Sequence, residues 1–259
     1  MIITSPHNEK LKEIRKLRQR KRWREHTSRF VAEGEDLLAA ADRAGWAPVD
    51  RFSVAGSGLG GIEVEARLLA GISGLASGTR ALAVYEERWL PAAQGPLCVY
   101  LHGVHDPGNI GAVLRSAEAF GASCVALGPG TADPFGPKAV RASMGSVFTV
   151  PLARTDALAA GLPGQTIALV AGGAGLALRE LCRSASGSGK EIAKDRDRGA
   201  LAPAGELTLM VGSEREGLPQ TLVEQADHIA HIPIESHSLN AATAAAIALY
   251  ELATRMPRP

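Results

Sequence analysis

The stretch LCVYLHGVHDPGNIGAVLRSAEAFGASCVAL, residues 97–127, contains the pattern that indicates the fold class. It begins with an apolar run of strand length, passes through a polar turn into an amphipathic helical pattern, and returns to a second apolar run. Further runs of this kind, with helical patterns between them, lie at 146–150, 166–170, 207–211 and 228–232. Short apolar strands separated by helices are typical of a parallel sheet covered on both faces. The sequence therefore predicts an α/β domain over residues 97–259.

The residues before this domain predict a smaller α/β unit, residues 1–90. A basic helix is expected near 8–25, a helix near 35–45, and strands near 50–54 and 81–85. The segment 89–96, with two prolines and a glycine, has the composition of a linker. The small, polar and charged segment 184–205 interrupts the larger domain and is expected to be a flexible surface insert.

The composition excludes several classes of protein. The chain has 259 residues, 46% of them hydrophobic and 21% charged, and no run approaches the ~18 apolar residues of a membrane span. No apolar leader begins the sequence. Three widely spaced cysteines, Cys98, Cys124 and Cys182, argue against a disulfide framework and a zinc site. These features predict a cytoplasmic protein with neither a membrane nor a metal partner.

The charge of the chain is concentrated at one end. Residues 1–30 hold ten lysines and arginines against three glutamates, so this segment carries +7 while the whole chain carries +1. Clustered cations are what the neutralisation of phosphates needs. Nucleic acid is therefore the expected partner, and the candidate RNA-binding side chains, which include one from a later basic segment, are Lys12, Arg15, Lys16, Arg18, Arg20, Arg22 and Arg141.

Three polar loops each follow a predicted strand of the larger domain. They are DPGNIGAVLRSA (106–117), VGSEREGLP (211–219) and IPIESHSLNAATAAAIALYE (232–251). Ligands of open parallel sheets sit beyond the carboxyl ends of the strands, so we expect these loops to meet at one pocket. Within them, Asn109 and Ser238 are expected to cap the helices that follow.

These three segments, in this order, closely resemble the three motifs of the SpoU (TrmH) branch of the SPOUT RNA methyltransferases. The segment FGPKAVRASMGSVFTVP (135–151) resembles the family's basic segment between motifs one and two. Residues 5–38 resemble the substrate-binding domain of members that modify ribosomal RNA. The resemblance implies methyl transfer from S-adenosyl-L-methionine to a ribose 2′-hydroxyl, in a domain whose C-terminal part forms a deep trefoil knot.

The resemblance also implies roles for individual residues. Arg115 matches the family's catalytic arginine, which positions the substrate and is held to take the proton of the hydroxyl. Asn109 is expected to orient Arg115 or the substrate, and Glu214 to brace the arginine or its loop. Ser238 and Asn240 are expected to shape the floor of the site.

Cofactor binding, again by resemblance, falls on the loops of the knot. The expected contacts are Leu127, Gly128, Gly212, Ile232 and Leu239. One departure from the family pattern is the loop 233–237, which lacks the usual glycine and is about two residues shorter. This departure bears on the detailed cofactor contacts.

Two alternative functions remain at this point. One is a transfer RNA methyltransferase, and the other is a non-catalytic RNA-binding assembly factor with a SPOUT-like domain. The presence of Asn109, Arg115, Glu214 and Asn240 together favours an enzyme, because a module that only binds RNA does not need them.

The last helix predicts a homodimer. Its AATAAAIALYELA run (241–253) is apolar around most of its circumference, and a helix of this kind needs a cover. The family pairs through its knot region in a two-fold arrangement. Ala245 and Leu249 are therefore expected at the interface, and each active site is expected to draw residues from both subunits.

Overall fold

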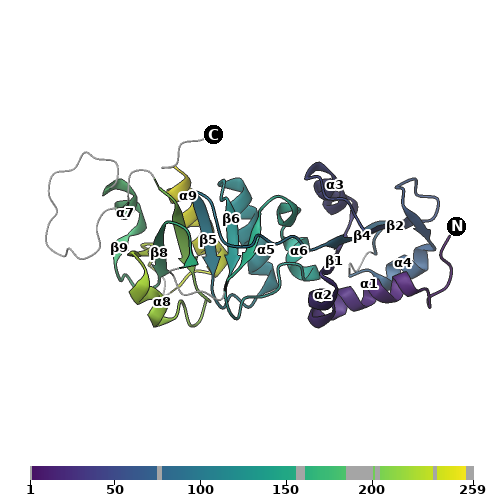
Figure 1. The fold of residues 1–259 in the computed structure, drawn as a ribbon, viewed down its shortest axis with the longest axis horizontal. Helices are drawn as coiled ribbons and strands as arrows, with labels where there is room; N and C mark the ends of the chain where they lie inside the picture. The colour runs from purple at the N-terminus through teal and green to yellow at the C-terminus, as the bar shows by residue number, and fades with distance from the viewer. Residues whose placement is uncertain are drawn as a thin grey trace. The chain divides into compact units, whose positions relative to one another are not determined.

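The computed structural model describes residues 2–74, 78–155, 161–184, 201, 205–235 and 238–254 (Figure 1). The chain forms two compact units. The first comprises the chain up to Arg88 together with Asp133–Thr149, and the second comprises Trp89–Ala132 and the chain from Val150 onwards. Most of the expected insert at 184–205 lies outside the described residues.

The first unit is built on a four-stranded sheet. Its strands are β1 (Arg29–Glu33), β2 (Asp50–Val54), β3 (Ile62–Val64) and β4 (Ala81–Glu86), in the order β1-β4-β2-β3. β4 is antiparallel to both of its neighbours, whereas β2 and β3 are parallel. The α/β character expected for this region is thus confirmed, and β1 and β3 are strands that the sequence pattern did not indicate.

Helices cover this sheet. They are α1 (Glu9–Gln19), α2 (Lys21–Thr27), α3 (Glu35–Arg43), α4 (Ala66–Ile72), α6 (Pro137–Ala142) and the short 3-10 helix η1 (Ser146–Phe148). The buried stripe of α1, residues Leu11, Ile14 and Leu17, packs into the core of the unit. The spacing of these three residues is what makes α1 amphipathic.

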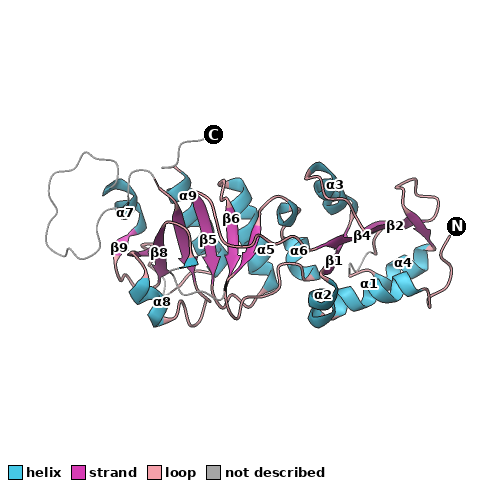
Figure 2. Ribbon diagram, in the orientation of Figure 1, coloured by secondary structure: helices cyan, strands magenta, loops and turns pink. Residues whose placement is uncertain are grey.

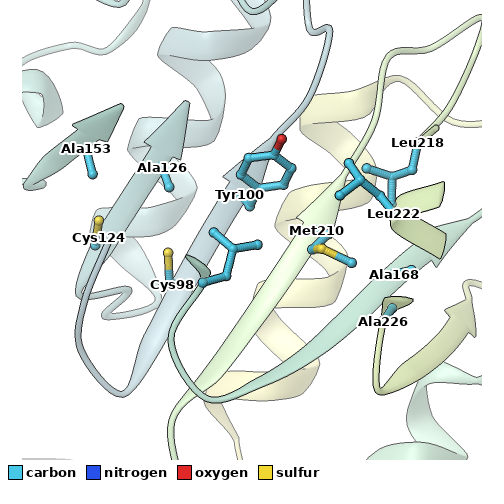
Figure 3. Packing of buried hydrophobic residues seen from close by; sticks show 11 residues of the cluster. Cys98, Tyr100, Cys124, Ala126, Ala153, Ala168, Met210, Leu218, Leu222 and Ala226 are labelled. Carbon is cyan, nitrogen blue, oxygen red and sulfur yellow. The ribbon is translucent and has the colours of Figure 1, made fainter. Parts of the chain in front are cut away.

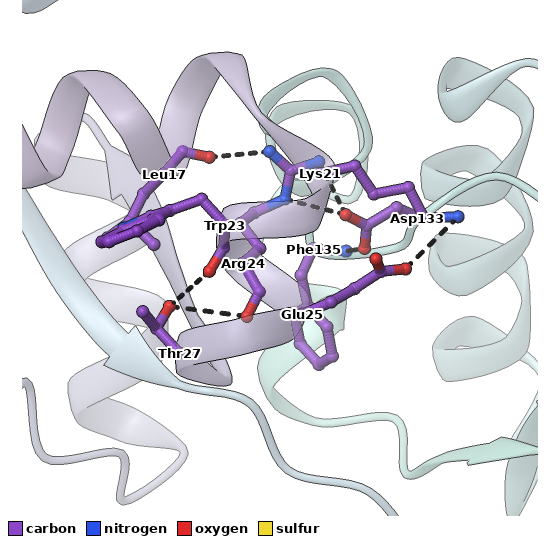
Figure 4. A network of polar contacts seen from close by, with 8 residues as sticks. All are labelled: Leu17, Lys21, Trp23, Arg24, Glu25, Thr27, Asp133 and Phe135. Carbon is purple, nitrogen blue, oxygen red and sulfur yellow. Dashed lines mark hydrogen bonds and ion pairs between the residues drawn. The ribbon is translucent and has the colours of Figure 1, made fainter.

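The basic helix expected near 8–25 is two helices, so that expectation was wrong. Arg20 is extended at φ −125°, ψ 107° and ends α1. The chain turns there, and α2 brings the buried guanidinium of Arg24 back to the carbonyl of Leu17 at 2.7 Å. The same guanidinium forms a 2.7 Å ion pair with Asp133, whose other carboxylate oxygen accepts from the amide of Phe135 (Figure 4).

The segment Asp133–Thr149 is a structural part of the first unit although it follows β6 in the chain. Phe135 and Phe148 stack on Phe30, and the indole N–H of Trp46 donates to the carbonyl of Phe148 at 2.8 Å. The strand expected at 146–150 is therefore wrong: residues 146–148 are η1. Gly145, at φ +105°, turns the chain so that the apolar residues of this run fill the core.

The second unit holds a seven-stranded parallel sheet in the order β7-β6-β5-β10-β8-β11-β9. The strands are β5 (Leu97–Leu101), β6 (Cys124–Leu127), β7 (Leu152–Arg154), β8 (Gln165–Val170), β9 (Leu176–Ala177), β10 (Leu207–Val211) and β11 (His228–His231). Its helices are α5 (Pro107–Ala119), α7 (Leu178–Ser184), α8 (Gln220–Gln225) and α9 (Ala241–Ala253) (Figure 2). The predicted parallel sheet is confirmed.

Small and flexible apolar side chains pack on one face of this sheet. Cys98 and Cys124 are neighbours in register on β5 and β6, and Tyr100, Met210 and Leu218 continue the cluster (Figure 3). All three cysteines are buried, and none of them forms a disulfide. The hydrogen bond between the Cys98 and Cys124 thiols and their burial raise the pKa of Cys98 far above its ordinary value, which keeps this thiol protonated.

Candidate functional site

The loops after β5, β10 and β11 bring three polar side chains together. β5 and β10 are parallel neighbours with Leu101 opposite Val211, so the loops that follow them start side by side. Asn109 donates from Nδ2 to Oε1 of Glu214, and Nδ2 of Asn240 donates to Oδ1 of Asn109 at 3.0 Å. One residue from each of the three motifs thus joins one network.

The direction of this network follows from its chemistry. An ionised carboxylate only accepts hydrogen bonds, so the Asn109 amide presents its nitrogen to Glu214 and its oxygen to Asn240. Asn240 in turn keeps its own oxygen for the backbone amides of Ala242 and Thr243, at 3.0 and 3.3 Å. Each amide orientation is therefore set by the next group.

Both helix caps differ from the expected ones. Asp106 caps α5 by accepting from the amide of Gly108 at 2.6 Å, and Pro107 occupies the first helical position. Proline suits that position because its missing N–H would have no partner there. Asn240 caps α9, two residues after the expected Ser238, which is exposed. With Asp106 as the cap, Asn109 is free to join the network.

Arg115 lies on α5, six residues after Asn109, and is exposed. It forms no ion pair or side-chain hydrogen bond with the part of the chain that the structure describes. Glu214 contacts Asn109 rather than this arginine. All five donors of the guanidinium are therefore available to a ligand.

A cavity of ≈ 540 Å³ lies at the carboxyl ends of β8, β10 and β11. Five of the expected site residues line it: Gly212, Glu214, Ile232, Ser238 and Leu239. Leu127 and Gly128, also expected as cofactor contacts, are not among its lining residues. Gly128 packs against Tyr100, whose hydroxyl oxygen would lie 2.2 Å from a Cβ at this position.

The loop that follows β10 requires a glycine at position 212 in order to close. A Cβ at Gly212 would lie 2.1 Å from the carbonyl carbon of Gly217. The loop between these residues closes on itself, with Ser213 and Gly217 forming an isolated bridge. The absence of a side chain lets the two ends of the loop that carries Glu214 approach each other.

Sequence reasoning missed one wall of the cavity. Residues Ala171, Gly172 and Ala174, which follow β8, line it together with Leu169 and Val170 at the end of that strand. The signal was present, because the glycines at 172, 173 and 175 follow an apolar strand of a parallel sheet. All three have positive φ, as a tight loop requires. The loop 233–237, which departs from the family pattern, is described only up to Glu235, and its last two residues lie outside the described part of the chain.

The sequence model of the SpoU rRNA Methylase family matches residues 96–250, more than half of the chain. The chain belongs to the SpoU rRNA methylase family. A second model, the MRM3-like substrate binding domain, matches residues 8–83.

Relatives of SpoU type cover nearly the whole chain. The 23S rRNA (guanosine(2553)-2′-O)-methyltransferase RlmP of Bacillus subtilis is 28% identical over 96% of this chain and 98% of its own length. An AdoMet-bound rRNA methyltransferase from Sinorhizobium meliloti is 31% identical, covers 100% of this chain and 99% of its own, and gives a TM-score of 0.79. AviRb of Streptomyces viridochromogenes, at 24% identity over 96% of this chain and 98% of its own with a TM-score of 0.76, shows the shared fold.

The substrate-binding match covers six of the seven candidate RNA-binding residues of this SpoU protein, all but Arg141. Their surroundings differ in the structure. Lys12 pairs with Glu9 at 2.7 Å, and the ammonium of Lys16 lies 4.5 Å from the ring centroid of Trp23. Arg15 and Arg18 line a cavity. The remaining candidates are exposed: Arg20, Arg22 and Arg141.

Two negative findings apply to the described part of this SpoU chain. Among those residues, no helix has the length and hydropathy to cross a membrane. No group of three or more histidine, cysteine, aspartate or glutamate side chains there is arranged to hold a metal ion.

Proposed function

We propose that the protein transfers a methyl group from S-adenosyl-L-methionine to a ribose 2′-hydroxyl of ribosomal RNA. The observation that carries this proposal is the network of Asn109, Glu214 and Asn240 beside a cavity at the strand ends. Relatives with the same two-part organisation are named as rRNA methyltransferases, one of them bound to AdoMet.

The cavity has the properties that this cofactor needs. Its volume lies within the ~300–1,000 Å³ of small-molecule sites. The side chains of Leu169, Val223 and Ile229 supply apolar walls, and the loops after β8, β10 and β11 supply backbone amide and carbonyl groups. Gly212, Ile232 and Leu239 would hold the cofactor there, and we assign no contact to Leu127 or Gly128. The cofactor supplies an electrophilic methyl group on a sulfonium.

Arg115 is proposed as the residue that holds the substrate. A guanidinium with free donors can bind a phosphate through two parallel hydrogen bonds and so place the adjacent ribose hydroxyl in line for reaction. Arginine carries its charge at neutral pH, which makes it a poor base. Contact with a phosphate favours this charged form further, so we propose Arg115 as the group that positions the substrate and do not assign it the removal of the hydroxyl proton.

The amide network is proposed to position the loops. Asn109 sits in the first turn of α5, the helix that carries Arg115, and is held from both sides by Glu214 and Asn240. The network thereby links the start of that helix to the loop after β10 and to the cap of α9. Ser238 lines the cavity and is proposed to shape its floor.

We propose a homodimer as the working form. α9 packs against α5, α7 and β10 of its own unit, so that Ala245 and Leu249 are fully buried there. Its other face leaves Tyr250 56% exposed and Ile247 37% exposed. The ring of Phe120, the C-cap residue of α5, meets Tyr250 edge to face with centroids 5.9 Å apart. This exposed apolar face, and not Ala245 or Leu249, is the proposed interface. A trefoil knot stays a prediction, which the late strand β10 between β5 and β8 supports.

Mapping 2′-O-methylation in ribosomal and transfer RNA, from cells with and without the protein, tests the function. We expect one ribosomal site to lose its methyl group and the cytoplasm to be the place of action. Loss of a transfer RNA site instead would favour the transfer RNA alternative. Calorimetry with S-adenosyl-L-methionine separates an enzyme from an RNA-binding assembly factor, since only the enzyme needs micromolar cofactor binding.

A further inference from the structure

A second cavity lies in the first unit, and none of its lining residues belongs to the proposed methyl-transfer site. It measures ≈ 420 Å³. Its lining residues come from α1, the end of α4 and the start of α6: Arg15, Arg18, Gln19, Gly71, Ile72, Ser73 and Pro137. Arg18 and Pro137 also border a much smaller cavity, which Arg141 lines. The wall is therefore cationic on one side and apolar on the other.

The geometry of α1 places two arginines on the same side of this cavity. Arg15 and Arg18 are three residues apart, a spacing that puts side chains next to each other on a helix. Like charges at this spacing destabilise a helix, and an anion bound between them removes that cost. The guanidinium of Arg15 uses one of its donors for the carbonyl of Pro6 at 2.9 Å and keeps the others.

Arg18 is nearly buried yet has no hydrogen bond within the described residues. Its side chain is 17% exposed, and its closest acidic partner is Glu33 at 3.8 Å, too far for a hydrogen bond. Glu33 already accepts hydrogen bonds from the hydroxyl of Ser73 and from the amide of Gly74. A guanidinium held in a cavity with free donors is a site for an anion.

We infer that this cavity binds one nucleotide of the RNA substrate. Arg15 and Arg18 hold its phosphate, while the base lies against Pro137. The volume is within the range of small-ligand sites, and single-stranded RNA is recognised by bases that are splayed out of the stack. The inference rests on the proposed function, because an RNA substrate is what the positive charge of residues 1–30 complements.

Gly71 allows the cavity to be filled without changing a charge. A Cβ on Gly71 meets nothing within 4 Å, and its backbone is helical. Gly71→Leu therefore places a side chain in the cavity and favours α4, since leucine is a much better helix former than glycine. The matched control is Ala66→Leu, which adds a leucine at an exposed position of the same helix.

Binding of decauridylate is measured by fluorescence anisotropy for both variants. The leucine side chain occupies the space of the base, so we expect Gly71→Leu to weaken binding about tenfold. Ala66→Leu is expected to stay within about twofold of the parent. An abasic ribose-phosphate decamer tests the role of the base: Gly71→Leu should affect it less than decauridylate. Equal binding of decauridylate by Gly71→Leu and Ala66→Leu would overturn the inference.

Arg15→Gln tests the phosphate contact. It should weaken binding of bulk bacterial ribosomal RNA about tenfold and lower the slope of log K against log salt by about one. Arg67→Gln is the control, because Arg67 lies on α4 outside the cavity and its side chain is 75% exposed. If both variants lower the slope equally, the basic residues act as a general charge and the cavity assignment is wrong.

Methyl transfer to ribosomal RNA is assayed in parallel, so that the two proposals fail separately. Suppose that the parent protein methylates RNA and that the Gly71→Leu variant binds and methylates RNA like the parent. This result would contradict nucleotide binding by the cavity and leave the proposed reaction intact. A parent protein without methyl transfer, together with weakened RNA binding by Gly71→Leu, would support the cavity and contradict the proposed reaction.

Discussion

Asn240 donates a 3.0 Å hydrogen bond to the side-chain oxygen of Asn109 while its own side-chain oxygen caps α9. The last helix of the second unit and the first turn of α5 are thus joined through one amide. Because Asn109 also donates to Glu214, a change at position 240 reaches the loop after β10 as well. Substitutions of Asn240 can therefore separate its contribution to helix stability from its contribution to the position of Asn109.

Asn240→Asp should keep the fold and lose activity. Aspartate caps a helix as well as asparagine does, but its carboxylate cannot donate to Asn109. We expect thermal stability within about 1 kcal/mol of the parent and methyl transfer reduced more than tenfold. Asn240→Ala, the comparison, removes the cap too and should cost roughly 1 kcal/mol of unfolding free energy. An active Asn240→Asp enzyme would show that the bridge to Asn109 has no role in positioning.

Arg115→Ala should abolish methyl transfer and leave thermal stability and cofactor binding nearly unchanged. The side chain is exposed and has no ion pair in the described structure, so its removal breaks no contact of the fold. Arg115→Lys should fail as well, since an ammonium cannot make the planar two-pronged contact with a phosphate. Single-turnover assays with saturating cofactor measure this, and near-normal turnover by the alanine variant would remove Arg115 from the proposed reaction.

Asp133→Ala should destabilise the first unit by about 3–5 kcal/mol, because it leaves the buried guanidinium of Arg24 without its partner. Replacing both residues, in Arg24→Met with Asp133→Ala, should cost less than the single change. Chemical denaturation measures the cycle. If the double variant is the less stable one, Arg24 still stabilises the fold without Asp133, through its hydrogen bond to Leu17.

The same packing changes how RNA binding should be tested. Removal of residues 1–90 would expose Phe135 and Phe148, which stack on Phe30, so a truncated protein reports on misfolding as well as on lost charge. Point substitutions such as Arg15→Gln avoid this.

Tyr250→Arg should produce a monomer that lacks methyl transfer. The side chain is 56% exposed on the free face of α9, so the variant can fold while an apolar interface there cannot form. Ala245→Arg is unsuitable, since Ala245 is fully buried in its own unit. Light scattering coupled to chromatography gives the mass. A parent protein that is active as a ~27 kDa monomer would end the dimer proposal. A Tyr250→Arg variant that stays an active dimer would rule out this face of α9 as the interface.

Acid should destabilise the protein in part through His102. Burial lowers the pKa of His102 below its ordinary value, and its Nδ1 lies 3.0 Å from the hydroxyl of Tyr100. The unfolded chain therefore takes up this proton first, so stability is complete above pH ~6.5 and falls as the pH drops from there to the folded pKa. His102→Gln does not titrate and should lose less stability over this window. Parallel pH dependences of thermal unfolding for the two proteins would contradict the expectation.

Local patterns were enough to predict the sheet and the three loops. The apolar runs at 97–101, 166–170 and 207–211 became neighbouring parallel strands because continuous apolar runs are buried on both faces. The run at 146–150 has the same composition but formed η1, since Gly145 and the aromatic residues of the first unit outweigh strand propensity there. Caps were off by two or three residues because aspartate, serine and asparagine cap equally well.

The sequence was sufficient to predict an α/β region at each end of the chain and the three loops that carry polar side chains, because hydrophobic periodicity and turn chemistry act over short distances. Tertiary packing was needed to place Asn109 between Glu214 and Asn240, and to place Asp133–Thr149 in the first unit. It also placed Arg18 in the lining of a cavity, where it has no hydrogen bond to the described residues. These features depend on contacts between residues up to 131 positions apart. Such contacts form when whole strands and helices pack, and no local pattern encodes them.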